Sequence, residues 1–359
     1  MFRNPMKKIL FSATALVAVV SLVLAGCGDD NDSESADSSD KPLIVVTTNI
    51  LGDVVTNMVG DSFDVETIMP PGSDPHDFQA SAQQVQMMMS ADLLIVNGAN
   101  FEEGMLDVIE NAESDGVMIF EATSVISQLE GSDDHSDHGG HDDHDDHEGH
   151  DDHDEEKDHD DHEGHGHDEE KDHDDHEGHD HGGIDPHFFT DPARMAIVAQ
   201  ELSEVLAANF PDADQGFVST ANDYVQQLQD LDSEVEETLS VISNDKRLLV
   251  TNHGVFAYFA DRYSFTILGE IIPSSSTLAS ASAQQLASLA EEIKESQVKA
   301  IFADASSSDA LAQTLADEVN DVKVINLYTE SLGDPGSSGD SYIDMIRFNA
   351  EAIASALVE

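Results

Sequence analysis

The sequence predicts an α/β protein with two lobes, each built on a mainly parallel sheet, with one long helix and a cleft between them. Three observations support this. Short apolar runs rich in β-branched residues alternate with helical patterns before residue 130, and the same alternation returns after residue 245. An uninterrupted amphipathic pattern separates the two stretches. Buried runs alternating with helices are typical of parallel sheets covered on both faces.

The strands and helices are expected where the apolar runs and the periodic stretches fall. In the first lobe, a strand over 43–48 is followed by a helix within 49–60, and a strand within 63–70 by a helix within 81–91. A further strand and helix are expected in that order within 92–114, and a last strand within 117–122. In the second lobe, strands are expected within 247–253, 265–271, 299–305 and 322–328, and helices within 282–296, 307–319 and 342–357. Each lobe is therefore one set of alternating strands and helices.

Two helical stretches lie between the lobes. Asp191 is a typical cap for the first, with Pro192 at its first helical position. The second is expected over 215–242, where apolar residues recur every three or four positions: Tyr224, Leu228, Leu231, Val235 and Leu239. This second helix either joins the lobes as a strut or packs as ordinary core.

The N-terminus has the features of an exported protein. Arg3, Lys7 and Lys8 precede an apolar run that ends in Leu-Ala-Gly-Cys at residues 24–27. The run is nearly long enough to span a membrane. However, the small residues before Cys27 and the acidic, Ser-rich tether after it resemble a bacterial lipobox, in which the cysteine is lipidated. We therefore expect a domain attached by lipid to the extracytoplasmic side of a membrane, and a lone cysteine excludes an internal disulfide framework.

These features predict five regions. They are a lipoprotein signal peptide (1–26), an acidic tether (27–41), a first lobe (42–213) with an insertion over 131–183, a linking helix (214–243) and a second lobe (244–359).

The formal net charge is −61 at pH 7. A field of this sign makes nucleic acid and anionic lipid surfaces poor partners and makes cations good ones.

The histidines fall into two groups. Fifteen of the 18 lie between residues 135 and 181, among Asp, Glu, Gly and Ser. The other three are His76, His187 and His253, each in a loop beside an expected strand or a capped helix. Each alone is most simply a structural histidine. Together, three neutral imidazoles meeting between two lobes would suit a divalent cation, with zinc first.

The insertion over 131–183 contains almost no apolar residues and repeats its histidines and acids. Burial within it could not offset the entropy of ordering, so we expect it to be disordered without metal. It is either a solvated spacer or, as its ligand-rich composition favours, a weak collector of zinc ions.

Four stretches carry a resemblance to a known family: "PPGSDPHDFQAS", "DPHFFTDP", "TNHGVFAYFADRYSF" and "INLYTESLG". In order and spacing they resemble the metal-binding solute-binding lipoproteins of ABC importers, whose members bind zinc, manganese or iron. The likeness covers residues 42–359. It implies that His76, His187 and His253 are metal ligands and that the long helix is a strut that limits closure of the lobes.

This chain departs from the family pattern at two positions. Glu330 stands where the family usually has an aspartate, so its direct coordination of metal is less secure than that of the histidines. Gly254 stands where an acidic residue is common. Because manganese binders often use a carboxylate as the third ligand, His253 favours zinc.

The resemblance implies a monomeric, non-enzymatic receptor that captures Zn²⁺ and delivers it to an ABC permease and its ATPase. Zinc-class members often carry such a histidine-rich loop. The alternatives are a manganese- or iron-specific receptor of the same family, a surface adhesin or metal buffer, and a zinc hydrolase. The hydrolase is the weakest, because the sequence shows no HExxH motif and offers Glu330 for a fourth position.

Overall fold

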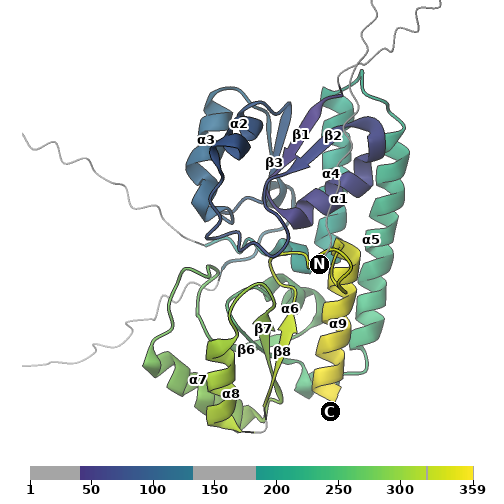
Figure 1. Ribbon diagram of the computed structural model, residues 1–359. Helices are drawn as coiled ribbons and strands as arrows, with labels where there is room; N and C mark the ends of the chain where they lie inside the picture. The colour runs from purple at the N-terminus through teal and green to yellow at the C-terminus, as the bar shows by residue number, and fades with distance from the viewer. Residues whose placement is uncertain (1–40, 132–182, 321, 359) are drawn as a thin grey trace, which may run out of the picture. The chain divides into compact units, whose positions relative to one another are not determined.

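The computed structural model of this chain describes residues 41–131, 183–320 and 322–358, which belong to one compact unit (Figure 1). The predicted signal peptide, the predicted lipobox with Cys27 and residues 132–182 of the insertion lie outside the described residues.

Two four-stranded sheets form the centres of the two lobes, and all of their strand pairs are parallel. The first sheet has the spatial order β2 (Asp64–Thr67), β1 (Leu43–Val46), β3 (Leu93–Val96), β4 (Ile119–Glu121). The second has the order β6 (Thr266–Glu270), β5 (Leu248–Thr251), β7 (Ala300–Asp304), β8 (Lys323–Leu327). The two orders match strand for strand, so each lobe places its second strand along the chain at one edge.

Helices cover both faces of each sheet. The first lobe carries α1 (Asn49–Val59), α2 (Ala82–Met89), α3 (Leu106–Ser114) and α4 (Pro192–Asn209). The second carries α6 (Ala257–Tyr263), α7 (Ala283–Ser296), α8 (Ala310–Val319) and α9 (Tyr342–Val358). The long helix α5 (Phe217–Leu239) contacts α1 and α4 of the first lobe and α9 of the second (Figure 1).

The alternation of side chains along each strand divides the core into three parts. Successive strand residues face opposite sides, so Ile44 packs with α1 while its neighbour Val45 packs with α2 and α3. In the second sheet, Phe302 and Ile301 divide in the same way. The outer faces thus have separate cores, whereas one apolar cluster covers the inner faces of both sheets and continues through α4, α5 and α9.

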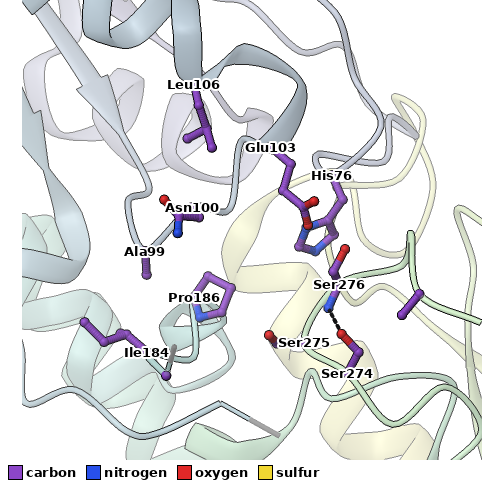
Figure 2. A pocket seen from close by; sticks show the side chains of 12 residues that line it. His76, Ala99, Asn100, Glu103, Leu106, Ile184, Pro186, Ser274, Ser275 and Ser276 are labelled. Atoms are coloured by element: carbon purple, nitrogen blue, oxygen red, sulfur yellow. Dashed lines mark hydrogen bonds and ion pairs between the residues drawn. The ribbon is translucent and has the colours of Figure 1, made fainter. Parts of the chain in front are cut away.

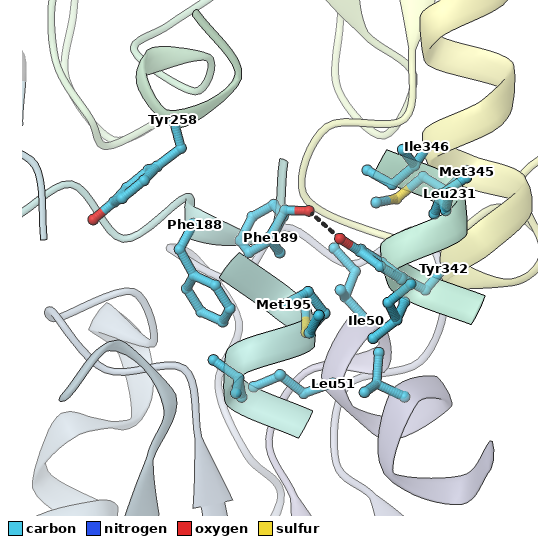
Figure 3. Close-up of a cluster of buried hydrophobic side chains, with 14 of the residues drawn as sticks. Ile50, Leu51, Phe188, Phe189, Met195, Leu231, Tyr258, Tyr342, Met345 and Ile346 are labelled. Atoms are coloured by element: carbon cyan, nitrogen blue, oxygen red, sulfur yellow. Dashed lines mark hydrogen bonds between the residues drawn. The ribbon is translucent and has the colours of Figure 1, made fainter. Parts of the chain in front are cut away.

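This shared cluster ties the lobes together. Phe188, Phe189, Tyr342 and Leu231 of α5 all belong to it, and the Tyr342 hydroxyl donates to the carbonyl of Phe189 at 2.8 Å (Figure 3). The backbone N–H of Tyr342 also donates to Asp53 of α1. Relative movement of the lobes would have to shear this packed surface, which is costly because protein interiors are close-packed.

The predicted fold class is confirmed, and the linking helix is both strut and core. Its ordered length, Phe217–Leu239, is shorter at both ends than the expected 215–242. One helix, α6, was not predicted. Its seven residues include Tyr258, Phe259 and Tyr263, all buried, so packing rather than helix propensity specifies it.

Candidate metal centre

All four sequence-predicted site residues meet at one place between the lobes. One ligand atom from each of His76, His187, His253 and Glu330 lies within 4.8 Å of the others, and none of the four side chains is more than 2 % exposed. The cluster draws on both lobes, from segments up to 254 residues apart in the chain.

Glu330 is the centre of the cluster. Its Oε1 lies 2.9 Å from Nε2 of His76, 3.3 Å from Nε2 of His187 and 3.1 Å from Nε2 of His253. The first two nitrogens donate hydrogen bonds to it, whereas the His253 nitrogen makes none. These separations are close to the ~3.3 Å between neighbouring ligand atoms around a tetrahedral zinc ion with bonds of about 2.0–2.1 Å.

His76 and His187 are positioned by the same local sequence, Asp-Pro-His. Asp74 Oδ1 accepts from the backbone N–H of His76 at 2.9 Å, and Asp185 Oδ1 accepts from that of His187 at 2.7 Å. In each segment, the proline between the aspartate and the histidine fixes the backbone angle φ at its own position in the turn. His76 follows β2 through a loop, whereas His187 precedes a 3₁₀ turn (Phe188–Thr190) that leads into α4.

The second ring nitrogen of these two histidines meets a carboxylate. Nδ1 of His76 donates to Glu103 Oε1 and Nδ1 of His187 donates to Asp185 Oδ1, both at 2.9 Å. A carboxylate on the far nitrogen of a metal-bound imidazole fixes its tautomer and orientation. The phenyl ring of Phe101 lies edge-on to both imidazoles, with centroids 5.1 and 5.4 Å away, and forms an apolar wall.

The second lobe presents His253 and Glu330 from the carboxyl ends of strands. His253 comes two residues after β5, and Glu330 comes three residues after β8. Next to Glu330, the Ser331 hydroxyl accepts from Asn49 Nδ2 and from Gly72 N, both at 2.8 Å. The segment that carries the carboxylate is therefore held by two residues of the first lobe.

The charges of the cluster are strongly coupled. Burial alone would lower the pKa of His76, but its hydrogen bonds to Glu103 and Glu330 outweigh burial and raise that pKa to about 10. Burial also opposes protonation of His187, yet Asp185 and Glu330 raise its pKa above 6.5. For Glu330, burial favours the neutral acid, but His253, His187 and His76 hold its pKa well below 4.5. In the metal-free protein, His76 therefore holds a proton where a cation would bind.

Three atoms of the cluster lack hydrogen-bond partners. Among the described residues, Glu330 Oε2 and both ring nitrogens of His253 are buried without a hydrogen bond. Buried polar atoms are rarely left unpaired in native proteins, and each one costs about 1–3 kcal/mol. A cation bound in the cluster would give the unpaired oxygen of Glu330 a partner.

Sequence reasoning did not find the supporting carboxylates Glu103, Asp185 and Asp74. The repeated Asp-Pro-His was a visible signal for the two aspartates. Nothing local marked Glu103. Its neighbour Glu102 points inward, where it accepts from the Thr47 hydroxyl at 2.6 Å and from Asn97 N at 2.7 Å.

Two α/β lobes joined by a rigid helix, with a buried histidine–carboxylate cluster between them, define the class of solute-binding proteins that present a cation to an importer. The family described as "Zinc-uptake complex component A periplasmic" matches residues 44–356, and the chain belongs to this family. It is accordingly a metal-binding component of an ABC transporter and not an enzyme.

Similar proteins agree on the class and differ in the metal that their names state. The chain is 26 % identical over 360 residues to the manganese ABC transporter substrate-binding lipoprotein PsaA of Streptococcus anginosus, covering 98 % of this chain and 99 % of PsaA. It is 24 % identical to the manganese-binding lipoprotein MntA of Halalkalibacterium halodurans, with 98 % and 99 % covered.

Among solved structures, the periplasmic zinc binding protein TroA from Treponema pallidum superposes with a TM-score of 0.68 at 25 % identity, covering 88 % of this chain and 99 % of TroA. The Mn-bound periplasmic metal binding protein from Candidatus Liberibacter asiaticus has the same fold, with a TM-score of 0.68 at 20 % identity and with 88 % and 100 % covered.

This membership implies a permease, an ATPase and a divalent metal ion as partners, and it places the chain outside the cytoplasm, at the membrane. In the part of the chain that the structure describes, every helix is too short or too polar to cross a bilayer.

Proposed function

We propose that this chain is the zinc receptor of an ABC importer, and that His76, His187, His253 and Glu330 bind one Zn²⁺ between the lobes. The observation that carries the proposal is the convergence of three imidazole Nε2 atoms on one buried carboxylate oxygen, at 2.9, 3.1 and 3.3 Å. Three nitrogens and one oxygen are a common donor set for tetrahedral zinc.

Manganese is the competing candidate, and the names of PsaA and MntA favour it. Manganese prefers oxygen-rich sites with more ligands. Here three of the four candidate ligands are imidazoles, and the further carboxylates Glu103 and Asp185 are engaged with imidazole Nδ1 atoms. The donor chemistry thus supports zinc, and the named relatives support manganese.

Affinity alone would not separate the two, because zinc binds more tightly than manganese at almost any such site. The decisive measurement is uptake of labelled zinc and labelled manganese by cells that carry the wild-type chain, the His253→Ala chain or neither. The proposal expects wild type to restore zinc uptake and His253→Ala to fail. Restoration of manganese uptake alone, with zinc unaffected, would establish the competing candidate.

The same binding site can be measured without the histidine-rich insertion. The N–H of Gly131 donates to the carbonyl of Gly183 at 3.0 Å, and Glu130 and Ile184 form an antiparallel bridge. Because these ends are neighbours in space, a short linker can replace residues 132–182 without displacing the lobe. We expect one tight zinc ion in the shortened protein and additional weak ones in the full chain.

Three further parts of the proposal depend on the sequence. Cys27 is the lipid attachment site, the insertion collects zinc by many weak contacts, and the mature protein is a monomer. Mass spectrometry of the purified protein would detect the acyl chains on Cys27. Equilibrium dialysis of the two forms would count the ions that the insertion adds.

A further inference from the structure

We propose that Glu103 is a transfer ligand, a carboxylate that takes the incoming cation in an open cavity beside His76 and passes it to the buried cluster. This inference rests on the proposed function, since it assigns a route to the same site.

The cavity lies at the interface of the lobes. It has a volume of about 380 Å³, and its walls include Glu103 and Asn100 of the first lobe and Ser274, Ser275 and Ser276 of the second (Figure 2). Leu106 and Ile184, also in its walls, are 37 % and 41 % exposed, so the cavity opens to solvent. A cation with six waters needs roughly 180 Å³ at about 30 Å³ per water, so it can enter with its hydration shell.

Of the four clustered residues, His76 is the one that lines this cavity. Side-chain exposure falls along one row of contacts, from 27 % for Glu103 to 2 % for His76 and 0 % for Glu330. His187 and His253 are fully buried. Among the described residues, Glu103 is also the one carboxylate in the cavity wall. A hydrated cation that enters here meets Glu103 before any of the four.

The backbone holds Glu103 in this position. The residue before it, Glu102, is anchored inward by its hydrogen bonds to Thr47 and Asn97. Gly104 follows, and a Cβ there would lie 2.3 Å from the carbonyl oxygen of Phe78, in the loop that carries His76. Only glycine allows this close approach, which keeps the Glu103 carboxylate 2.9 Å from the His76 ring.

The transfer is an exchange of ligands with no change in oxidation state. One Glu103 oxygen leaves His76 Nδ1 and replaces one water of the hydrated cation. Glu330 and the Nε2 atoms of the three histidines then displace the remaining waters. The protons that the Nε2 atoms held leave to solvent. Glu103 finally returns to accept the hydrogen bond from His76 Nδ1, where it fixes the ring of the loaded site.

A transfer ligand differs kinetically from a residue that only positions His76. It lowers the barrier between free and bound cation, so its loss slows association and dissociation by the same factor and leaves Kd unchanged. Loss of a positioning contact weakens binding, and this appears mainly as faster dissociation. Glu103→Gln separates the two roles, because the amide oxygen still accepts from His76 Nδ1 but is a far poorer metal ligand.

The experiment follows zinc exchange between the full mature chain and a fluorescent chelator by stopped flow. It compares wild type, Glu103→Gln and Glu113→Gln, which removes an equal charge from the exposed far end of α3. The His253→Ala chain gives the signal of all zinc bound outside the tight site, including that of the insertion. We expect Glu103→Gln to slow kon and koff each by about tenfold, with Kd within about threefold of wild type, and Glu113→Gln to match wild type.

Three outcomes would overturn the inference. They are unchanged rates, faster dissociation with unchanged association, and slower association alone that disappears at high salt. The second would make Glu103 a positioning residue, and the third would show distant electrostatic steering without contact. If wild type and His253→Ala behaved alike, the proposed site itself would be wrong.

Discussion

Two segments of this molecule share the sequence Asp-Pro-His and the same first hydrogen bond, yet their aspartates are used differently. Asp185 is buried, and one of its oxygens accepts from both the backbone N–H and the ring Nδ1 of His187. Asp74 bonds the backbone N–H of His76 but gives its other oxygen to the Thr277 hydroxyl of the second lobe, at 2.8 Å. The hydrogen bonds of the Asp185 carboxylate thus stay within its own turn, whereas those of the Asp74 carboxylate span the cleft.

Because of this difference, we infer different roles for the two histidines in the metal site. The Nδ1 of His187 is held by a carboxylate of its own turn, Asp185. His76 depends on Glu103 for its ring and on the second lobe, through Asp74, for its loop. We infer that His187 is the fixed part of the site and that His76, beside the open cavity, is the part that adjusts as metal enters and leaves.

The largest effect should follow from removing a ligand. We expect His76→Ala, His187→Ala and His253→Ala in the shortened protein each to weaken zinc binding by more than about 100-fold, which is beyond the 10–100-fold typical of supporting residues. Glu330→Ala should cost less, because a water can take a fourth position. Chelator competition measures all four. Tight one-to-one binding by all three histidine variants would refute the assignment.

The next effect concerns protons. The pKa of His76 is raised to about 10, so at neutral pH its ring carries an extra proton that zinc must displace, and Asp185 and Glu330 shift the pKa of His187 in the same direction. For imidazoles with an ordinary pKa, competition would end above about pH 6.5. Here the apparent zinc affinity should still rise between pH 7 and 8.5, by up to about tenfold per pH unit for each proton released.

Calorimetry in two buffers of different ionisation enthalpy would count those protons, and we expect between one and two at pH 7. An affinity that is level above pH 7 would show that the rings are neutral in the metal-free protein. The carboxylates bonded to His76 and His187 would then not raise the pKa of either ring.

The two aspartates themselves provide a direct comparison. Asp185→Ala should weaken zinc binding by about 10–100-fold, because it leaves His187 Nδ1 buried without a partner. Asp74→Ala should weaken it by less than about tenfold, since Nδ1 of His76 keeps Glu103. Asp185→Asn, which retains an acceptor, should recover part of the loss. Equal effects of the two alanine variants would contradict the different duties inferred here.

The sequence predicted the fold because short apolar runs rich in β-branched residues and one uninterrupted apolar stripe are local signals. It also predicted which residues cluster, through the few histidines outside the insertion and the family motifs. It did not predict Glu103 or the tie between Asp74 and Thr277. The first depends on Glu102 and Gly104 packing against a distant loop, and the second joins residues 203 positions apart. Neither contact leaves a periodicity or a motif in the chain.

The smallest effect should come from the hydrogen bond across the cleft. Thr277→Val keeps the shape of the side chain and removes the hydroxyl that donates to Asp74, a contact worth about 0.5–1.5 kcal/mol. The unfolding temperature should change little, because the shared apolar cluster and not this bond joins the lobes. Zinc release into excess chelator should become about two- to threefold faster, since the loop of His76 loses its hydrogen bond to the second lobe.

Thr314→Val on α8 is the matched control, because its hydroxyl bonds only within its own helix, to the Ala310 carbonyl. An unchanged release rate for Thr277→Val, or the same acceleration in the control, would show that the bond across the cleft does not retain the metal.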